Sequence, residues 1–216
     1  MKKSYYPLFL NLDAKKCVIF GGGEVALRKV KMLLDFRTDV AVISPEVCPE
    51  LVELGKNRTI KIIARKYHPD DLNDALIAIA ATDDEKTNQV IAHEAGRKGV
   101  LVNVVDRPEL CDFIVPAYIK RGDVTIAVST NGKSPALARK IRARLEQDFG
   151  EEYAALAELI GEVRGELRKL NARLDGENWQ EALDLDLLTE LLRKGETGKA
   201  RAILLDSLKT AGEVSS

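Results

Sequence analysis

The sequence predicts an α/β protein, with a doubly wound parallel sheet in the first half of the chain and helices alone in the last third. Between residues 17 and 105, short apolar runs alternate with segments whose apolar residues recur at helical spacing. Three consecutive glycines, at 21–23, join the first apolar run to the first of these segments. After residue 150, apolar residues step by three and four positions, as on one face of a helix. Strand–helix–strand units at this spacing produce a parallel sheet with helices on both faces.

The elements of the first half follow one another at regular intervals. Helices are expected at 24–35 and at 83–99, the second opened by acids and closed by Gly96 or Gly99. Alternating leucines at 8–12 and the turn-like residues NLDAKK predict a short opening hairpin. Strands are expected at 17–20, 40–44, 60–63, 75–82 and 100–105, and the runs at 17–20 and 75–82 are apolar enough to be buried on both faces.

The segment 114–148 combines a strand with a basic helix. DVTIAVST at 123–130 has the period of a strand, and Ser134 and Pro135 suit the N-cap and first position of the next helix. Seven lysines and arginines against three acids give the segment a net charge of +4. These cations either meet an anionic ligand or form a solvated helix face, and charge alone leaves both readings open.

The tail beyond residue 150 is expected to be all-helical. Its apolar residues form a heptad seam, followed by a break at DGEN and two shorter helices around 180–194 and 197–209. The seam consists of Tyr153, Leu156, Ile160, Val163, Leu167, Leu170 and Leu174. A seam of this kind packs on a helical partner, either inside the chain or across a dimer.

The composition is that of an ordinary globular protein and narrows the classes of partner. The chain has 216 residues, of which 45% are hydrophobic and 31% charged, and its net charge is −1. No apolar run reaches 18 residues, so we expect no membrane partner. We expect no nucleic acid as a partner either. Cys17, Cys48 and Cys111 form no CxxC pair, which fits a reducing cytoplasm and a protein without a metal cage.

The turn at 21–26 has the pattern G-x-G-x-x-A and directly follows an apolar strand. Gly21 allows a sharp exit from the strand, Gly23 lets a pyrophosphate approach the backbone, and Ala26 lets the helix pack close to the strand. The free N–H groups at the helix start favour an anion. The pattern predicts a Rossmann-like domain that binds NAD, and the alternative is a tight turn without a ligand.

Polar residues after the second and fourth strands are candidates for cofactor contacts. A carboxylate usually holds the adenosine ribose after the second strand. Ser44 and Glu46 are the candidates here, and because no arginine stands beside them, the sequence favours NAD over NADP. Thr82 either lies against the cofactor or helps begin the next helix, which Asp83 and Asp84 are expected to cap.

The fifth strand ends in NVVDRPELCDF, which places Asn103 and Asp106 where the crevice above the sheet should lie. A carboxylate there could take a proton while a hydride leaves a substrate. The alternative is an aspartate that only ends a strand before Arg107 and Pro108. Chemistry alone gives the two interpretations equal weight.

Four stretches together are far more specific than the glycine turn. They are VIFGGGEVALRKVKMLL, AIAATDDEKTNQVI, NVVDRPELCDF and FIVPAYIKRGDVTIAVSTNGKSPALAR. With the helical tail, they resemble the precorrin-2 dehydrogenase and sirohydrochlorin ferrochelatase family, the dehydrogenase module of sirohaem synthases, over nearly the whole chain.

The resemblance implies NAD-dependent oxidation of precorrin-2 to sirohydrochlorin, with metal insertion as a second activity in some members. It implies a homodimer of three-part chains: a dinucleotide-binding domain at 1–113, a small α+β dimerisation region at 114–148 and a helical region at 149–216. It makes Asp106 the essential aspartate, and it places Thr130 where some relatives have a serine. The implied cofactor contacts are Gly21, Gly23, Glu24, Val25, Pro45 and Glu46.

The substrate implied by the resemblance is a tetrapyrrole whose carboxylates need cations or helix N-termini. Arg121, Lys133 and Arg139 could hold them together with the helix start at Ser134, or could instead pair the two subunits. Asn103 and Thr130 complete the residues expected near the substrate. The alternative function is a non-catalytic module that senses NAD(H), which would need no base at Asp106.

Overall fold

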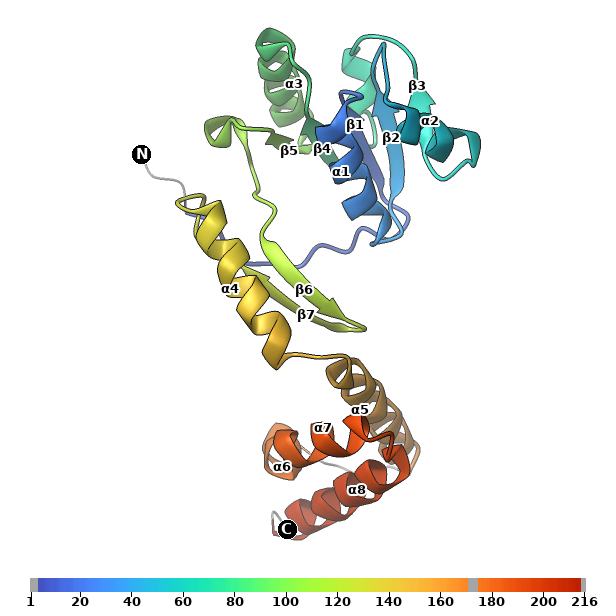
Figure 1. Cartoon of the computed structure of the whole chain (residues 1–216), viewed down its shortest axis with the longest axis vertical. Helices are drawn as coiled ribbons and strands as arrows, with labels where there is room; N and C mark the ends of the chain where they lie inside the picture. The colour runs from blue at the N-terminus through green and yellow to red at the C-terminus, as the bar shows by residue number, and fades with distance from the viewer. Residues whose placement is uncertain (1–3, 171–174, 215–216) are drawn as a thin grey trace. The chain divides into compact units, whose positions relative to one another are not determined.

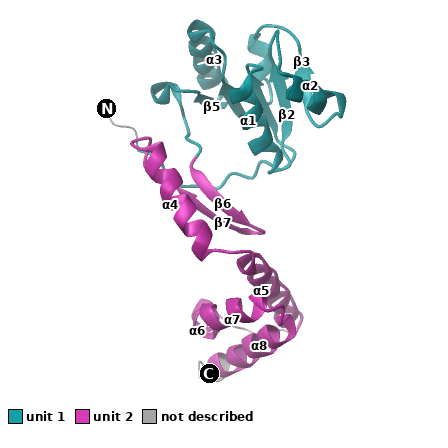
Figure 2. Ribbon diagram, viewed as in Figure 1, with its two compact units in different colours: residues 1–115 teal, residues 116–216 magenta. Residues whose placement is uncertain are grey.

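The computed structural model describes residues 4–170 and 175–214. They form two compact units, Met1–Val115 and Pro116–Ser216 (Figures 1 and 2). Each unit has apolar clusters of its own.

The first unit contains a sheet of five parallel strands in the order β3-β2-β1-β4-β5. The strands are β1 Lys16–Phe20, β2 Asp39–Ile43, β3 Lys61–Ile63, β4 Ile77–Ala80 and β5 Leu101–Val104. The central strand β1 pairs with β2 on one side and with β4 on the other, so Cys17 lies between Val40 and Ile77. The chain therefore reverses direction across the sheet at β1, which confirms the doubly wound α/β fold.

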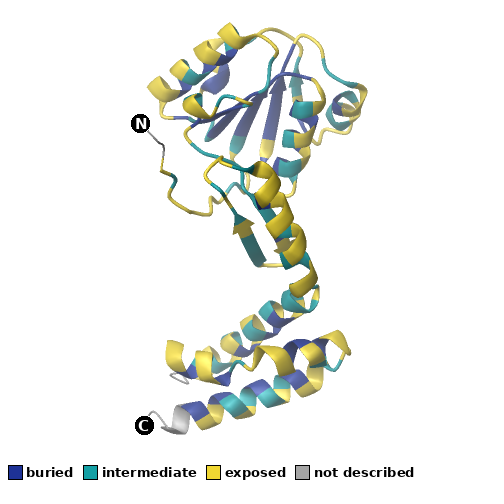
Figure 3. Ribbon diagram, turned by 60° about the vertical axis from the view of Figure 1, so that its left-hand side comes forward, coloured by how far each residue is buried: buried dark blue, intermediate teal, exposed yellow. Residues whose placement is uncertain are grey.

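Helices cover both faces of this sheet because its strands are apolar on both sides (Figure 3). On one face, residues of α1 and α2 pack with Cys17, Ile19 and Val42. On the other face, residues of α3 and η1 pack with Val18 and Phe20. The elements are α1 Glu24–Leu34, α2 Pro49–Lys56, η1 Pro69–Leu72 and α3 Glu85–Lys98. Gly99, with φ +70°, ends α3, which decides between the two expected glycines.

The expected opening hairpin is wrong. Residues 4–12 form no strand, and the turn that follows them leads straight into β1. Since β2 and β4 occupy both edges of β1, no edge is left for a preceding strand to pair with. Leu8 and Leu10, whose alternation suggested the strand, are exposed.

The second unit begins with an antiparallel hairpin of β6 Ala117–Arg121 and β7 Val124–Val128. The strand β6 was missed in the sequence because AYIKR mixes apolar and charged residues without a clear period, and its pairing with β7 makes it a strand. The helix α4, Pro135–Asp148, packs on this hairpin. Its start is as expected, since Ser134 Oγ accepts a hydrogen bond from the Leu137 N–H at 3.1 Å and Pro135 is the first helical residue.

Four helices complete the chain: α5 Glu152–Lys169, α6 Gly176–Ala182, α7 Leu185–Arg193 and α8 Thr197–Val214. Leu156 and Val163 of the heptad seam pack inside this bundle with residues of α7 and α8, so this part of the seam is intramolecular. Leu170 is exposed, and Leu174 lies outside the described residues. DGEN starts a helix instead of only ending one, because Asp175 caps α6 in a reciprocal pair with Asn178.

Candidate functional site

A pocket of about 900 Å³ opens at the carboxyl end of the sheet. Its lining comes from the residues that follow β1, β2, β3 and β4, namely 20–25, 43–48, 65–67, 81–84 and Thr87. In doubly wound sheets, ligands bind at this edge, where the strand order reverses. The pocket brings together the glycine turn and the residues after β2 and β4 that the sequence singled out.

The three glycines of the turn have different structural requirements. A Cβ on Gly21, whose φ is +118°, would lie 2.2 Å from the Ala81 carbonyl oxygen, and one on Gly22 would lie 1.9 Å from that of Glu46. A Cβ on Gly23 would meet no atom within 4 Å. Gly21 and Gly22 are thus required for chain packing, whereas Gly23 leaves open space in the pocket.

That open space lies at the start of α1. Gly23 is the N-cap of this helix, and no side chain caps it. The first N–H groups of the helix and its positive dipole end therefore remain available to an anion. Glu24 and Val25, the first two helical residues, also line the pocket. This geometry fits the pyrophosphate of a dinucleotide.

After β2, the side chain of Ser44 is turned toward the backbone. Its hydroxyl donates to the Glu46 carbonyl oxygen at 2.6 Å, which holds the turn through Pro45. The Glu46 side chain is exposed at the pocket. Of the two candidates for the ribose contact, Glu46 thus has the freer side chain.

Two cations of this pocket, Arg65 and Lys66, were missed in the sequence because they follow β3 and not β2. The guanidinium of Arg65 makes two hydrogen bonds to the Asp71 carboxylate, at 2.8 and 2.5 Å. Burial opposes ionisation of Asp71, but hydrogen bonds from Arg65 and the His68 N–H outweigh it and lower the pKa of the carboxyl group. Because β3 pairs in parallel with β2, Arg65 and Lys66 after β3 lie beside the residues that follow β2.

After β4, Thr82 lines the pocket and Asp84 caps the next helix, α3. Asp84 caps α3, accepting a hydrogen bond from the Lys86 N–H at 3.0 Å, whereas Asp83 stands one residue earlier and lines the pocket. Thr82 lines the pocket too, and its hydroxyl donates to the Asn88 side-chain oxygen at 2.8 Å. Its methyl-bearing side chain is therefore held in place at the pocket wall.

Asp106 lies at the tip of the loop that follows β5. The loop folds back on the strand, because the Asp112 N–H donates to the Val102 carbonyl at 2.8 Å and the Asp112 carboxylate accepts from the Val102 N–H at 3.0 Å. Asp106 is exposed and has a φ of +59°, a left-handed conformation that non-glycine residues adopt infrequently. It is not among the lining residues of the 900 Å³ pocket.

Lys29 of α1 is electrostatically coupled to Asp106. Burial and the neighbouring Arg28 lower the pKa of Lys29, while Cys111 and Asp106 oppose the shift. The charge of Lys29, on the helix that starts at the glycine turn, therefore interacts with the Asp106 carboxylate after β5. The sequence carried no signal for Lys29, because its relation to Asp106 depends on how α1 packs on the sheet.

Asn103 has a structural role in this loop. Its side chain is buried, and its amide donates to the Phe113 carbonyl at 3.0 Å. The thiol of buried Cys111 accepts from the Val104 N–H at 3.2 Å in the same region. These contacts hold the loop that carries Asp106.

The expected substrate residues of the second unit fall into two places. The Thr130 hydroxyl accepts from the Ser134 N–H at 3.1 Å and donates to the Ser134 carbonyl at 3.0 Å, which closes the loop before α4. Lys133 lies in this loop, and Arg139 follows on the exposed side of α4. Arg121 lies at the other end of the hairpin, beside its turn, and pairs with Glu151 at 3.2 Å.

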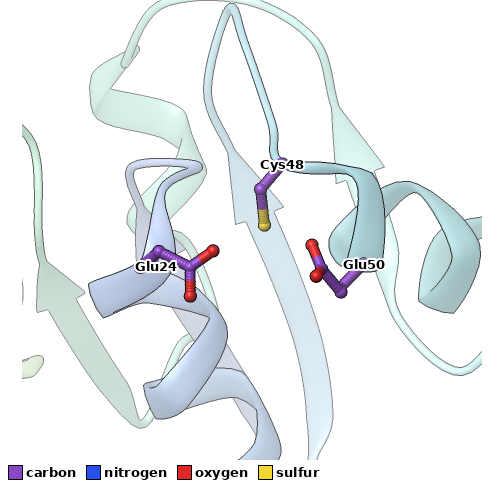
Figure 4. A group of neighbouring side chains, drawn as sticks. All are labelled: Glu24, Cys48 and Glu50. Atoms are coloured by element: carbon purple, nitrogen blue, oxygen red, sulfur yellow. The ribbon is translucent and has the colours of Figure 1, made fainter.

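One group of side chains at the pocket mouth has ligand atoms close enough to share a cation. Glu24, Cys48 and Glu50 place one such atom each within 4.8 Å of one another, and all three side chains come together between α1 and the start of α2 (Figure 4). Exposed carboxylates often lie this close without an ion, so the group alone assigns no metal.

Comparison with known proteins defines the family. A family model described as putative NAD(P)-binding matches residues 8–117, just over half of the chain. The chain belongs to this NAD(P)-binding family. A second model, described as sirohaem biosynthesis protein central, matches residues 121–148. Within the described residues, no helix is both long and apolar enough to cross a membrane.

Curated relatives include the siroheme synthases of Thioalkalivibrio sulfidiphilus and Methylococcus capsulatus. The first is 38% identical over 211 residues, which make up 95% of this chain and 42% of the relative. The second is 39% identical over 209 residues, or 96% of this chain and 44% of the relative. The chain thus spans less than half the length of these relatives.

A solved structure named SirC, precorrin-2 dehydrogenase, matches the whole fold. It is 25% identical, with a TM-score of 0.71, and the match covers 95% of this chain and 100% of that one. The expected resemblance to the dehydrogenase module of sirohaem synthases is confirmed, and so is the expected NAD-binding domain.

Proposed function

We propose that this chain oxidises precorrin-2 to sirohydrochlorin, with NAD as the electron acceptor. The observation that carries the proposal is the likeness to SirC, precorrin-2 dehydrogenase, over 95% of this chain and the whole of that one. The pocket at the switch point and the acid after β5 supply the two chemical requirements, a dinucleotide site and a base. The three-part division at 1–113, 114–148 and 149–216 belongs to the same proposal.

The residues around the pocket would bind the dinucleotide along its length. The backbone of Gly21, Gly23, Glu24 and Val25 would hold the pyrophosphate at the uncapped start of α1. Ser44, Pro45 and Glu46 would meet the adenosine ribose at the end of β2, and Thr82 would close the wall after β4.

Bound NAD supplies a hydride acceptor. Asp106, an exposed carboxylate, takes the proton that the substrate loses in the same oxidation. Asn103 and Cys111 keep the Asp106 loop on β5.

The carboxylates of the tetrapyrrole would be met by the loop before α4. Lys133 and Arg139 are exposed, and their charged groups have no partner among the residues that the structure describes. The start of α4, which Ser134 caps, and the turn closed by Thr130 lie in the same segment. Arg121, at the far end of the hairpin, would then serve a different part of the substrate or the subunit contact.

A homodimer through the hairpin and α4 is part of the proposal. An isolated two-stranded hairpin is at best marginally stable, and one helix covers only one of its faces. Leu137 and Ile141, one helical turn apart on α4, are large apolar residues that are 51% and 38% exposed. A second copy of the chain would bury these surfaces. We also propose a cytoplasmic location, which fits the three free cysteines.

The deciding experiment mixes the protein with enzymatically made precorrin-2 and NAD. The sirohydrochlorin absorption spectrum should appear together with NADH absorbance. An NAD(H)-sensing module would bind NADH, seen by its fluorescence, without producing either signal. Adding cobaltous or ferrous ion to the same mixture tests for metal insertion as a second step.

A further inference from the structure

The end of the pocket beside β2 and β3 is lined by the segment 65–67, which the expected preference for NAD did not take into account. The Ile63 carbonyl accepts hydrogen bonds from both the Ser44 N–H, at 3.2 Å, and the Arg65 N–H, at 2.9 Å. The segment 65–67 is therefore attached to the place where the second strand ends, and it lines the same pocket as Ser44 and Glu46.

The backbone of this segment is anchored on both sides of Lys66. Before it, the Arg65 guanidinium binds the Asp71 carboxylate, whose side chain is only 4% exposed, and donates to the Lys66 carbonyl at 2.9 Å. After it, the Tyr67 ring packs edge-on against Phe20, with centroids 5.1 Å apart. Lys66 is thus presented from a fixed position.

Arg65 and Lys66 differ in whether their charge is neutralised by a neighbouring group. The charge of Arg65 is neutralised by Asp71, through the two hydrogen bonds described above. The Lys66 ammonium is exposed and has no hydrogen-bond or ion-pair partner in the described part of the chain. A free ammonium at the pocket wall is suited to a phosphate group.

The group that commonly excludes a phosphate from this place is absent from its usual position. Selective NAD sites use a carboxylate at the end of the second strand, which accepts from the ribose 2′-hydroxyl and repels a 2′-phosphate. Ser44 occupies that position, with its hydroxyl donated to the backbone. Glu46, two residues later, is exposed, so water and salt weaken its repulsion.

We propose that this pocket also accepts the 2′-phosphorylated dinucleotide NADP(H), with Lys66 as the residue that binds the 2′-phosphate. Arg65 acts as a positioning residue that holds the segment through Asp71. The inference rests on the proposed placement of the dinucleotide, with its ribose beside Ser44 and Glu46, and extends it to a second ligand.

The test is a pair of fluorescence titrations, NADH and NADPH, with the wild-type protein and three variants. Lys66→Ala and Lys66→Glu change the proposed contact, and Lys61→Ala, at an exposed residue of β3 outside the pocket lining, is the matched control. Wild-type affinity for NADPH should lie within about tenfold of that for NADH, and Lys66→Ala should weaken NADPH alone, by about fivefold. Lys66→Glu should weaken NADPH further, and Lys61→Ala should change neither titration.

Added salt gives a second readout, because it should weaken NADPH binding more than NADH binding in the wild type and not in Lys66→Ala. The inference is overturned if NADPH binds about a hundredfold more weakly than NADH, or if Lys66→Ala weakens both nucleotides equally. If neither nucleotide binds, the proposed placement of the dinucleotide is wrong, and the inference is wrong with it.

Discussion

Replacing Gly23 by alanine separates the role of the glycine turn in the fold from its role in binding. The backbone of Gly23, with φ −89° and ψ −169°, is accessible to alanine, and the added methyl group would meet no atom within 4 Å. Alanine lowers the conformational entropy of the unfolded chain, which stabilises the fold, but it is a poorer N-cap than glycine, which destabilises it. The two effects oppose each other, so the free energy of unfolding should change by no more than about 0.5 kcal/mol.

The same methyl group would occupy the space that a pyrophosphate needs. Displacing the anion from the first N–H groups of α1 removes one or two charge-assisted hydrogen bonds, each worth about 1.5 kcal/mol. NADH affinity, measured by fluorescence titration, should therefore fall by about tenfold to a hundredfold. Chemical denaturation of the same sample measures the stability.

Two control variants define the comparison. Gly22→Ala would bring Cβ to 1.9 Å from the Glu46 carbonyl oxygen, so it should cost about 2 kcal/mol of stability or more. Gly96→Ala, in α3 with open space around it, should stabilise the protein and leave NADH affinity unchanged. Wild-type NADH affinity in Gly23→Ala would refute the placement of the pyrophosphate at the start of α1.

Three further predictions concern the acid, the buried ion pair and the dimer. Asp106→Asn should lower precorrin-2 turnover by about a hundredfold or more while NADH affinity stays at the wild-type value; retained turnover would remove Asp106 from catalysis. Asp71→Asn should cost about 2 kcal/mol at pH 7, since Asp71 is buried and Arg65 half-exposed. Because the folded pKa of Asp71 is lowered, its contribution is present above its unfolded pKa and disappears as pH falls through the folded value, so urea unfolding of wild type and variant should converge below about pH 4. Leu137→Glu should produce monomers in light scattering, whereas Leu185→Glu, at an equally exposed leucine of α7, should not; a dimer that survives Leu137→Glu would contradict the proposed interface.

The tertiary structure explains where the sequence-based expectations failed. The leucines at 8–12 alternate as a strand would, but a strand forms only where a neighbour offers a free edge, and the edges of β1 are both occupied. Conversely, β6 lacks a strand pattern and is a strand because β7 pairs with it. The amide of Asn103 is bonded to the Phe113 carbonyl, a contact that depends on how the loop after β5 folds back on the strand.

The sequence alone determined the elements whose signals are local. Apolar runs identified the five strands of the sheet, the glycines identified the sharp turn before α1, and Ser134 with Pro135 marked the start of α4. Periodicity and capping act between residues close in the chain, so these signals are readable from the sequence. Only the tertiary structure decided the strand order, the intramolecular packing of Leu156 and Val163, and the arrival of Arg65 and Lys66 at the pocket. These features depend on which strands and helices become neighbours, and that choice is made by burial across the whole chain and not by any single segment.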